Sequence, residues 1–249
     1  MTKLPDAPPP YGTLVFDCDS TLSEIEGIEE LAGNQQDEIA RLTARAMDGA
    51  VPLEEVYGLR LERIRPTRPA VDAVAELYFE RRLPHAAELV AAARALGKRV
   101  VVVSGGVTPA VAPFAARLGI PAPGDVFAVD LHFDEGGAYT GFEEDSPLAR
   151  AGGKIDVLRR IAAAEAAGPV AFVGDGATDL EAAAEVARFV AFGGVARRPA
   201  VFEAARVRCE AADFAALVPQ LFSRDERARL GADPDHGPLM EAARTFDTA

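Results

Sequence analysis

The sequence predicts an α/β fold, in which a doubly wound parallel sheet carries a helical segment inserted after its first strand. From about residue 88 onwards, short apolar runs alternate with helical patterns, as in parallel sheets covered by helices on both faces. Residues 23–87 carry helical patterns and no strand pattern. Acidic or glycine-rich residues directly follow three of the apolar runs, where ligands bind in open parallel sheets. We therefore expect a core of residues 11–22 plus 88–224, a helical cap of residues 23–87, and flexible ends at 1–10 and 225–249.

The first strand is the short apolar run Thr13–Phe16, which ends at Asp17. A helix at 26–32 opens the insert. Apolar residues at helical spacing predict three more helices, at 36–47, 53–64 and 67–82. Asp48-Gly49 and Pro66 separate them, because these residues interrupt helices.

The remaining elements follow in alternation. We expect strands at 99–103, 170–173, 189–192 and 207–209, and helices at 86–96, 109–118, 154–167, 180–187 and 214–222. Residues 131–133 and 138–142 flank an acidic, glycine-containing turn and predict a hairpin. We expect Val126–Val129 to pair outside the main sheet. From Asp225 onwards, charged residues with Gly and Pro interruptions indicate a loosely packed tail.

Composition excludes several classes of partner. Of 249 residues, 49% are hydrophobic, which is enough for a sizeable core, and the net charge is −13. Such a protein is poorly suited to nucleic acid or to an anionic membrane surface, and no apolar run approaches the ~18 residues of a membrane span. Cys18 and Cys209 are too few for a disulfide framework, which favours a reducing cytoplasm. Monomer and homodimer are the two expected assembly states.

Two carboxylates leave the end of the first strand in Asp17-Cys18-Asp19, and the hydroxyl of Thr21 follows. Acids this close repel each other, so a cation or a shared proton must stabilise them. The leading Asp17 can act as a nucleophile, since carboxylates form acyl-phosphates in some phosphate-transfer enzymes. An acidic turn at the end of a strand gives the same pattern, so this stretch alone leaves both interpretations open.

Three further signals fit a phosphate site. Ser104-Gly105-Gly106 ends an apolar strand, where a hydroxyl and backbone N–H groups can bind phosphate oxygens. Lys154 begins a helix, at the end where the helix dipole favours acids, so an anionic ligand explains it better. Asp175 and Asp179 follow a third apolar run, and carboxylates converging from two strand ends suit Mg²⁺. Each signal alone is also typical of a glycine turn, a surface lysine or a helix cap.

In this order the motifs resemble those of the haloacid dehalogenase superfamily. The stretch Asp17-Cys18-Asp19-Ser20-Thr21, continued by Glu26-Gly27-Ile28-Glu29-Glu30-Leu31-Ala32, is similar to the phosphoserine phosphatases within that superfamily. The resemblance covers about residues 14–222 and places a helical cap where the insert lies. It implies a Mg²⁺-dependent hydrolase that converts O-phosphoserine to serine and phosphate, as in serine biosynthesis, through an aspartyl-phosphate.

The resemblance also implies roles for individual residues. Asp17 would attack phosphorus, and Asp19 would protonate the leaving oxygen and then activate water. Mg²⁺ would be held by Asp17, the backbone carbonyl of Asp19, and Asp175, with Asp179 supporting it through water. A metal ion and a lysine would also draw a phosphate to an acidic protein. The transferring phosphoryl group would be bound by Ser104, Gly105 and Lys154.

Substrate selectivity is expected in the insert, because the core sees only phosphate. The resemblance implies that Glu26 would accept a hydrogen bond from the substrate ammonium and that Arg60 would bind the substrate carboxylate. Met47 matches a position that packs near this pocket. Gly106 and Thr178 would also contact the substrate, and Thr178 stands where other family members carry asparagine. On the residues alone, solvated helix faces are the simpler interpretation of Glu26 and Arg60.

Three other functions remain open. A phosphatase of the same fold could act on another small phosphomonoester, or the phosphoryl group could pass from Asp17 to an alcohol acceptor. A signalling module could use a phosphorylated aspartate as a conformational switch. Asp19 argues against the switch, because a switch needs no built-in acid and base, and so does an insert that would cover the site.

Overall fold

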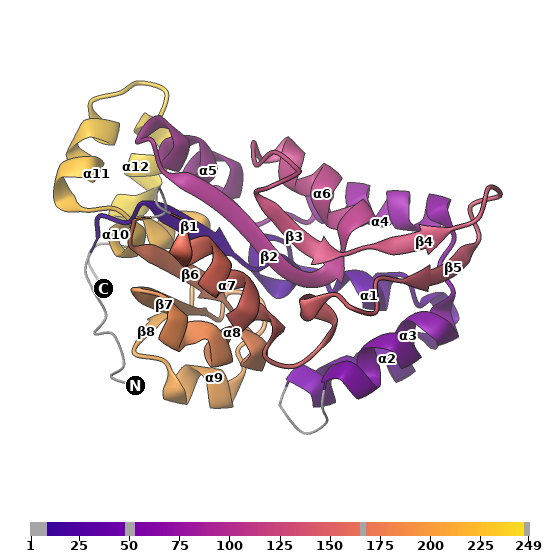
Figure 1. Ribbon diagram of the computed structural model, residues 1–249. Coiled ribbons are helices and arrows are strands. Elements are labelled where there is room, and N and C mark those ends of the chain that lie inside the picture. Colours follow the sequence, from indigo (N-terminus) through magenta and orange to yellow (C-terminus); the bar gives the residue numbers. More distant parts are fainter. Residues whose placement is uncertain (1–8, 48–52, 165–167, 247–249) are drawn as a thin grey trace.

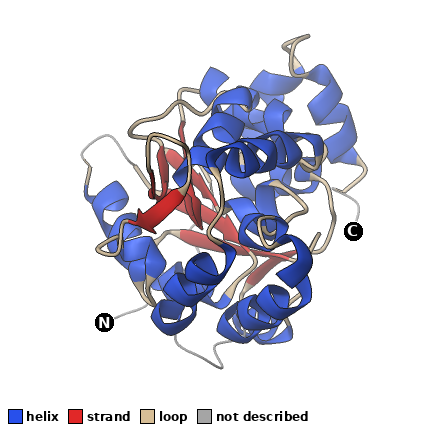
Figure 2. Cartoon of the chain, turned by 90° about the vertical axis from the view of Figure 1, so that its right-hand side faces the viewer, coloured by secondary structure: helices blue, strands red, loops and turns tan. Residues whose placement is uncertain are grey.

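The computed structural model describes residues 9–47, 53–164 and 168–246, and the side chains of residues 46, 47 and 53–55 lie outside the described part. At its centre is a six-stranded parallel sheet in the order β3-β2-β1-β6-β7-β8. Helices cover both faces of this sheet (Figures 1 and 2). The strands are β1 (Thr13–Phe16), β2 (Arg99–Val107), β3 (Val126–Val129), β6 (Val170–Gly174), β7 (Arg188–Phe192) and β8 (Val207–Cys209).

The sheet reverses its order at β1. All four residues of β1 are buried, and Phe16 lies opposite Val102 of β2 on one side and Val173 of β6 on the other. Strand β3 extends the β2 side, and β7 and β8 extend the β6 side. Such a switch point brings three carboxyl ends together at one sheet edge, which is where α/β proteins bind ligands.

The helices follow the right-handed crossovers that parallel strands require. On one face lie α5 (Ala86–Ala95) and α6 (Thr108–Arg117), and on the other lie α7 (Gly153–Ala163), α8 (Ala177–Glu181) and α9 (Pro199–Ala204) (Figure 1). The sequence suggested that Val126–Val129 pairs outside the main sheet, but β3 pairs in parallel with β2, because α6 returns the chain to the sheet edge. Short helical turns complete the core at Cys18–Leu22, Pro147–Ala149, Ala182–Glu185 and Phe214–Leu217, with α10 at Val218–Leu221.

Two segments from different parts of the chain cover the carboxyl end of the sheet. The first is the helical insert, with α1 (Gly27–Glu30), the turn Gly33–Gln35, α2 (Gln36–Met47), α3 (Leu53–Ile64) and α4 (Arg68–Glu80). The second is a hairpin of β4 (Leu131–Phe133) and β5 (Tyr139–Phe142), which lies beyond the carboxyl end of β2 in Figure 1. The hairpin packs on α3, where the Tyr57 and Phe142 rings are 5.5 Å apart.

The last helix of the insert is attached to the core. The two chain crossings run side by side, since Ser23 bridges Arg82 and the Leu83 N–H donates to the carbonyl of Leu22 at 3.0 Å. Beyond the crossings, α4 packs along α6, where Arg117 Nη1 lies 2.6 Å from Glu76 Oε2. Helix α4 is therefore held by α6 as well as by its neighbours in the insert.

The C-terminal segment differs from the loosely packed tail that its charges suggested. It forms α11 (Arg224–Gly231) and α12 (Gly237–Arg244). Ser223 and Glu226 cap the start of α11 reciprocally, each accepting from the other's backbone N–H. The buried ammonium of Lys98 donates to Glu226 and, at 2.6 Å, to the carbonyl of Tyr11. Apolar side chains bury the inner face of both helices: Leu230, Leu239, Met240 and Ala243.

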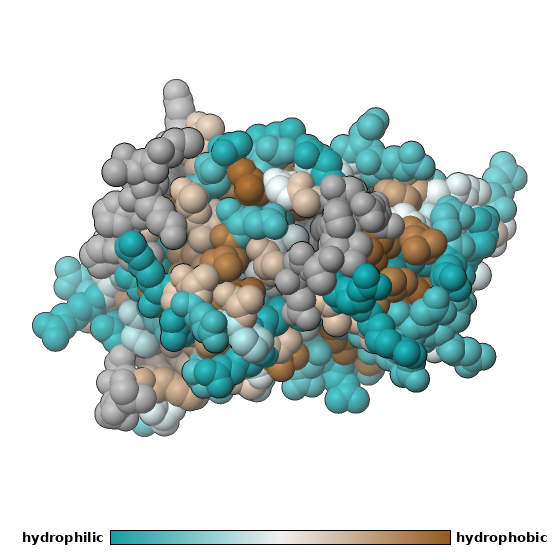
Figure 3. Space-filling view, turned by 90° about the horizontal axis from the view of Figure 1, so that it is seen from below, coloured by the Kyte–Doolittle hydropathy of each residue, from teal (hydrophilic) through white to brown (hydrophobic). Residues whose placement is uncertain are grey.

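The visible surface is mainly hydrophilic. Seen from below, hydrophobic residues form small patches between hydrophilic ones (Figure 3). Among the described residues, Leu59 is the large hydrophobic side chain that stands exposed, at 48%. None of the described helices combines the length and the apolar character needed to cross a bilayer.

Candidate active site

Asp17 leaves the carboxyl end of β1 and caps the turn that follows. Its Oδ1 accepts from the Cys18 N–H at 2.8 Å, and its backbone N–H donates to the carbonyl of Val173 in β6 at 3.0 Å. The carboxyl group is buried but reaches the wall of a cavity. Burial raises the pKa of Asp17 well above its ordinary value, even though Lys154 opposes the shift.

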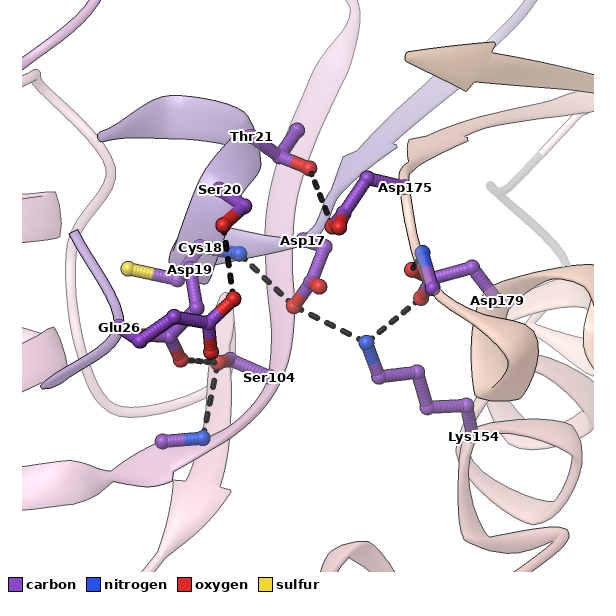
Figure 4. Close-up of polar contacts among 12 residues, drawn as sticks. Asp17, Cys18, Asp19, Ser20, Thr21, Glu26, Ser104, Lys154, Asp175 and Asp179 are labelled. Atoms are coloured by element: carbon purple, nitrogen blue, oxygen red, sulfur yellow. Dashed lines mark hydrogen bonds and ion pairs between the residues drawn. The ribbon is translucent and has the colours of Figure 1, made fainter. Parts of the chain in front are cut away.

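Lys154 joins two of the buried carboxylates (Figure 4). Its Nζ lies 3.0 Å from Asp17 Oδ1 and 2.6 Å from Asp179 Oδ1. Burial alone would lower the pKa of Lys154, but the charges of these two acids outweigh burial and raise it. Gly153 allows this placement, because a Cβ there would lie 1.6 Å from the carbonyl oxygen of Pro147. The start of α7 is thus pressed against the preceding turn, and its lysine points into the site.

Asp175 and Asp179 come from the end of β6 and the start of α8. Asp175 Oδ1 accepts from the Thr21 hydroxyl at 3.3 Å, and its Oδ2 accepts from Arg198 Nε at 2.9 Å. Asp179 Oδ2 accepts from the Gly176 N–H at 2.9 Å. Burial and the neighbouring Asp179 raise the pKa of Asp175 to about 7. The register of β1 and β6 therefore gathers acids from two strand ends into one place.

This cluster fits a divalent cation. Asp17, Asp175 and Asp179 each offer a carboxylate oxygen within 4.8 Å of the others, and all three are buried. Hard oxygen ligands are those that Mg²⁺ prefers. The raised pKa values of Asp17 and Asp175 indicate that Lys154 and Arg198 do not fully offset the buried negative charge. A bound cation would offset the rest.

Asp19 points toward the insert and receives hydrogen bonds on both oxygens. Its Oδ1 accepts from the Gly27 N–H at 2.7 Å and from the Tyr78 hydroxyl at 2.6 Å. Its Oδ2 accepts from the Ser104 hydroxyl at 3.3 Å, and Ser104 Oγ in turn accepts from the Gly106 N–H at 2.9 Å. Gly106 leaves room for this chain of contacts, since a Cβ there would lie 3.0 Å from Asp19 Oδ2.

The cavity beside these residues has a volume of about 630 Å³ when the solvent at its mouth is included. Three of the predicted residues do not line the cavity but contact residues that do. Ser104 and Gly106 lie against Asp19, and Asp179 accepts from Lys154. The side chain of Met47 lies outside the described residues. Core and insert face each other across the cavity. Most of the site residues predicted from sequence line its wall, from the core Asp17, Asp19, Gly105, Lys154, Asp175 and Thr178, and from the insert Glu26 and Arg60.

The two insert residues differ in their surroundings. Glu26 Oε1 accepts from the Ser20 hydroxyl at 2.7 Å and from Arg198 Nη2 at 3.3 Å. Burial, followed by the charge of Asp19, raises the pKa of Glu26 to about 8. Arg60 is 2% exposed and donates from Nη1 to the Thr43 hydroxyl at 2.8 Å. Its buried Nε has no hydrogen-bond partner within the described part of the chain. Arg60 therefore keeps a buried donor that an anionic group could use.

Sequence reasoning missed several residues of this site, among them Arg198 and Tyr78. Arg198, from the loop after β7, joins Asp175 to Glu26 and lines the cavity. Gly193-Gly194 directly after β7 was a usable signal, because glycines at the end of another strand had already indicated a ligand site. No sequence signal marked Tyr78, because in the sequence it is one of several apolar positions of a helix. Only the structure shows that its hydroxyl contacts Asp19.

Comparison with known proteins points to one family. The sequence profile of the haloacid dehalogenase-like hydrolases matches residues 14–184. The human protein "Phosphoserine phosphatase" is 38% identical over 181 residues, covering 72% of this chain and 80% of the human protein. "Phosphoserine phosphatase, chloroplastic" of Arabidopsis thaliana is 38% identical over 192 residues, covering 75% of this chain, which spans 64% of the plant protein's length.

A solved structure is similar over most of this chain. It is described as "Phospho-Aspartyl Intermediate Analogue of Phosphoserine phosphatase". It superposes with a TM-score of 0.73 at 25% identity and covers 86% of this chain and all of its own. The likeness therefore extends beyond the strand-end motifs to the arrangement of the elements that carry them.

Proposed function

This chain belongs to the haloacid dehalogenase-like hydrolases, and we propose that it is a Mg²⁺-dependent phosphoserine phosphatase that forms an aspartyl-phosphate on Asp17. One observation carries the proposal. A single cavity has the Asp17–Lys154 pair on its core wall and Glu26 and Arg60 on its insert wall. The first pair suits a phosphoryl group, and the second suits the ammonium and carboxylate of an amino acid.

In the first step, an oxygen of the Asp17 carboxylate attacks phosphorus. A bond forms between phosphorus and that oxygen, while the bond between phosphorus and the serine oxygen breaks and leaves its electron pair on serine. Asp19 donates its proton to that serine oxygen. Lys154 supplies positive charge to the phosphoryl oxygens as their charge redistributes.

In the second step, water hydrolyses the aspartyl-phosphate. Asp19, now a carboxylate, takes a proton from water as the water oxygen attacks phosphorus. The bond between phosphorus and Asp17 breaks, which restores the Asp17 carboxylate and releases inorganic phosphate. Asp19 ends the cycle protonated, so the same group serves first as acid and then as base.

The acidic cluster supplies a place for Mg²⁺. Asp17, Asp175 and the backbone carbonyl of Asp19 would hold the ion, and Asp179 would support it through water. When bound, Mg²⁺ would stabilise negative charge on the phosphoryl oxygens and help to align the reacting groups. Gly105 and Lys154, on the cavity wall, would bind the same phosphoryl group from the core side together with Ser104, whose hydroxyl donates to Asp19 behind that wall. Thr178 also lines the cavity.

Substrate selection would fall to the insert. Arg60 is buried, and its Nε donor has no partner among the described residues, which favours a charge-assisted hydrogen bond to the substrate carboxylate. Glu26 lies on the same wall and would accept from the substrate ammonium. Gly106 positions Ser104, and Met47 is assigned to the pocket on the resemblance alone.

A cytoplasmic location is consistent with Cys18 and Cys209, which are buried and form no disulfide.

The test is phosphate release from phosphoserine, phosphothreonine, a simple alkyl phosphate and an aryl phosphate, with Mg²⁺ and with a chelator. We expect the highest kcat/KM for phosphoserine, serine and phosphate in equal amounts, and loss of activity on chelation. The matched control is Asp17→Asn, which should release no phosphate from any of them. A tenfold preference for a substrate without the amino acid group would overturn the phosphoserine assignment.

A further inference from the structure

We propose that Tyr78 is a positioning residue for the proton transfer, which it serves by fixing the carboxyl group of Asp19 from the insert side. The inference rests on the proposed phosphatase function and assigns it a residue on α4. Tyr78 donates from its hydroxyl to Asp19 Oδ1 at 2.6 Å. This contact joins the insert to the group that is expected to move the proton.

The two oxygens of Asp19 have unequal surroundings. Oδ1 accepts from Tyr78 and from the Gly27 N–H, which can only donate. Oδ2 faces Ser104 at the longer distance of 3.3 Å. An oxygen that already receives two short hydrogen bonds is poorly placed to carry a proton as well. The proton for the leaving serine oxygen is therefore carried by Oδ2, on the side that adjoins Ser104 of the phosphate-binding loop.

Tyr78 is itself held firmly. It is fully buried, and its ring stacks on Phe114 of α6 with centroids 5.4 Å apart and planes inclined by 18°. Its hydroxyl occupies the space beside Gly27, where a Cβ would lie 2.0 Å away. Burial raises the pKa of the Tyr78 hydroxyl, so it stays protonated and remains a donor.

The Tyr78 contact also links the insert to the acid and base of the core. Tyr78 reaches Asp19 from α4, whose attachment to α6 includes the Arg117–Glu76 pair. The insert thus does more than select the substrate, because one of its side chains orients the acid and base of the core.

Tyr78→Phe tests this by removing only the hydroxyl. Cleavage of phosphoserine releases serine as an alkoxide that needs a proton, whereas cleavage of an aryl phosphate releases a stabilised phenolate that needs it far less. We expect kcat/KM for phosphoserine to fall about tenfold or more, and kcat/KM for the aryl phosphate to change by less than about threefold. Across a series of aryl phosphates, the rate should also depend more steeply on leaving-group acidity than in the wild type.

Tyr139→Phe is the matched control, since Tyr139 is a buried tyrosine of the hairpin that lies outside the cavity wall. It should leave both substrates unchanged, and thermal unfolding of both variants reports any general damage. Equal losses for the two substrates in Tyr78→Phe, or none, would overturn the inference. If the wild type prefers another alkyl phosphate, the proposed substrate fails, while the alkyl-to-aryl comparison still tests Tyr78. Absence of any phosphatase activity overturns both.

Discussion

Arg198 donates from Nε to Oδ2 of Asp175 across 2.9 Å, and so joins the loop after β7 to the end of β6. Its Nη2 reaches Glu26 at 3.3 Å. One guanidinium therefore spans the distance between the acids expected to bind metal and the acid expected to bind the substrate ammonium. The planar guanidinium offers a separate nitrogen to each acid, Nε to Asp175 and Nη2 to Glu26.

Arg198→Leu should lower kcat/KM for phosphoserine. Each charge-assisted hydrogen bond lost from a buried carboxylate is worth about 1.5–3 kcal/mol, which corresponds to about tenfold or more in rate. Arg198→Lys should recover part of the loss, because it keeps the charge but lacks the two separate nitrogen donors that face the two acids. Steady-state kinetics at saturating Mg²⁺ will show the order wild type, Lys, Leu. Equal activity in all three proteins would mean that this bridge has no part in turnover.

Glu26→Gln should stabilise the metal-free protein at alkaline pH. The pKa of Glu26 rises from 4.5 to about 8 on folding, chiefly because of burial. The folded wild type thus retains a proton that the unfolded chain loses, and its stability falls as pH rises through this window. Glutamine is neutral throughout and still accepts from Ser20. Its advantage should be near zero at about pH 4, grow between about pH 4.5 and 8, and then level off.

Urea unfolding of both proteins at several pH values, with chelator present, measures that difference. If the difference in the free energy of unfolding between the two proteins stays constant with pH, Glu26 does not carry a raised pKa. If the advantage of the variant shrinks as pH rises, the pKa of Glu26 is shifted in the opposite direction to the one expected.

Asp17→Asn should fold and have no turnover, because an amide is a poor nucleophile. It also removes a carboxylate that burial destabilises, so its melting temperature should equal or exceed that of the wild type in the absence of Mg²⁺. Phosphate release and trapping with beryllium fluoride measure the chemistry. Wild type should bind beryllium fluoride as an acyl-phosphate mimic, and the variant should not. Substantial turnover by the variant would rule out Asp17 as the nucleophile.

Arg60→Ala should change selectivity more than chemistry. It removes charge-assisted bonds worth roughly 1.5–3 kcal/mol each, so kcat/KM for phosphoserine should fall about ten- to a hundredfold. Hydrolysis of an aryl phosphate, which has no carboxylate for Arg60 to bind, should fall far less. The ratio of the two kcat/KM values is the measurement, and Glu26→Ala should lower it in the same way. A ratio unchanged in both variants would mean that another substrate occupies the cavity.

The sequence predicted the parts of the site that depend on strand ends. Asp17 and Asp175 directly follow β1 and β6, Ser104 lies in the last part of β2, and parallel register places these strand ends together. The glycines after β7 could have marked the loop that carries Arg198, but not its contacts, because the partners of Arg198 and Tyr78 lie far away in sequence. Their roles depend on how a loop and a helix pack, which no local pattern contains.

The C-terminal helices were missed for a different reason. Charged residues dominate 224–231, and their few apolar residues are too sparse to give a helical period. Ser223 followed by Glu226 was a helix-start signal that the charge run obscured. What stabilises this segment is tertiary burial of Leu230 and Leu239 together with the ion pair to Lys98.

The contact of Lys98 with Tyr11 and Glu226 has a consequence for protein synthesis. It joins three positions that leave the ribosome at widely separated times. Until Glu226 is synthesised, the only one of these two partners available to the Lys98 ammonium is the carbonyl of Tyr11. Burying a charge without an opposite charge beside it is costly. Burial of Lys98, just before β2, is therefore disfavoured until Glu226 is available. Ordering of this corner of the molecule awaits the synthesis of Glu226, whereas the cavity-forming strands β1 and β6 are synthesised before it.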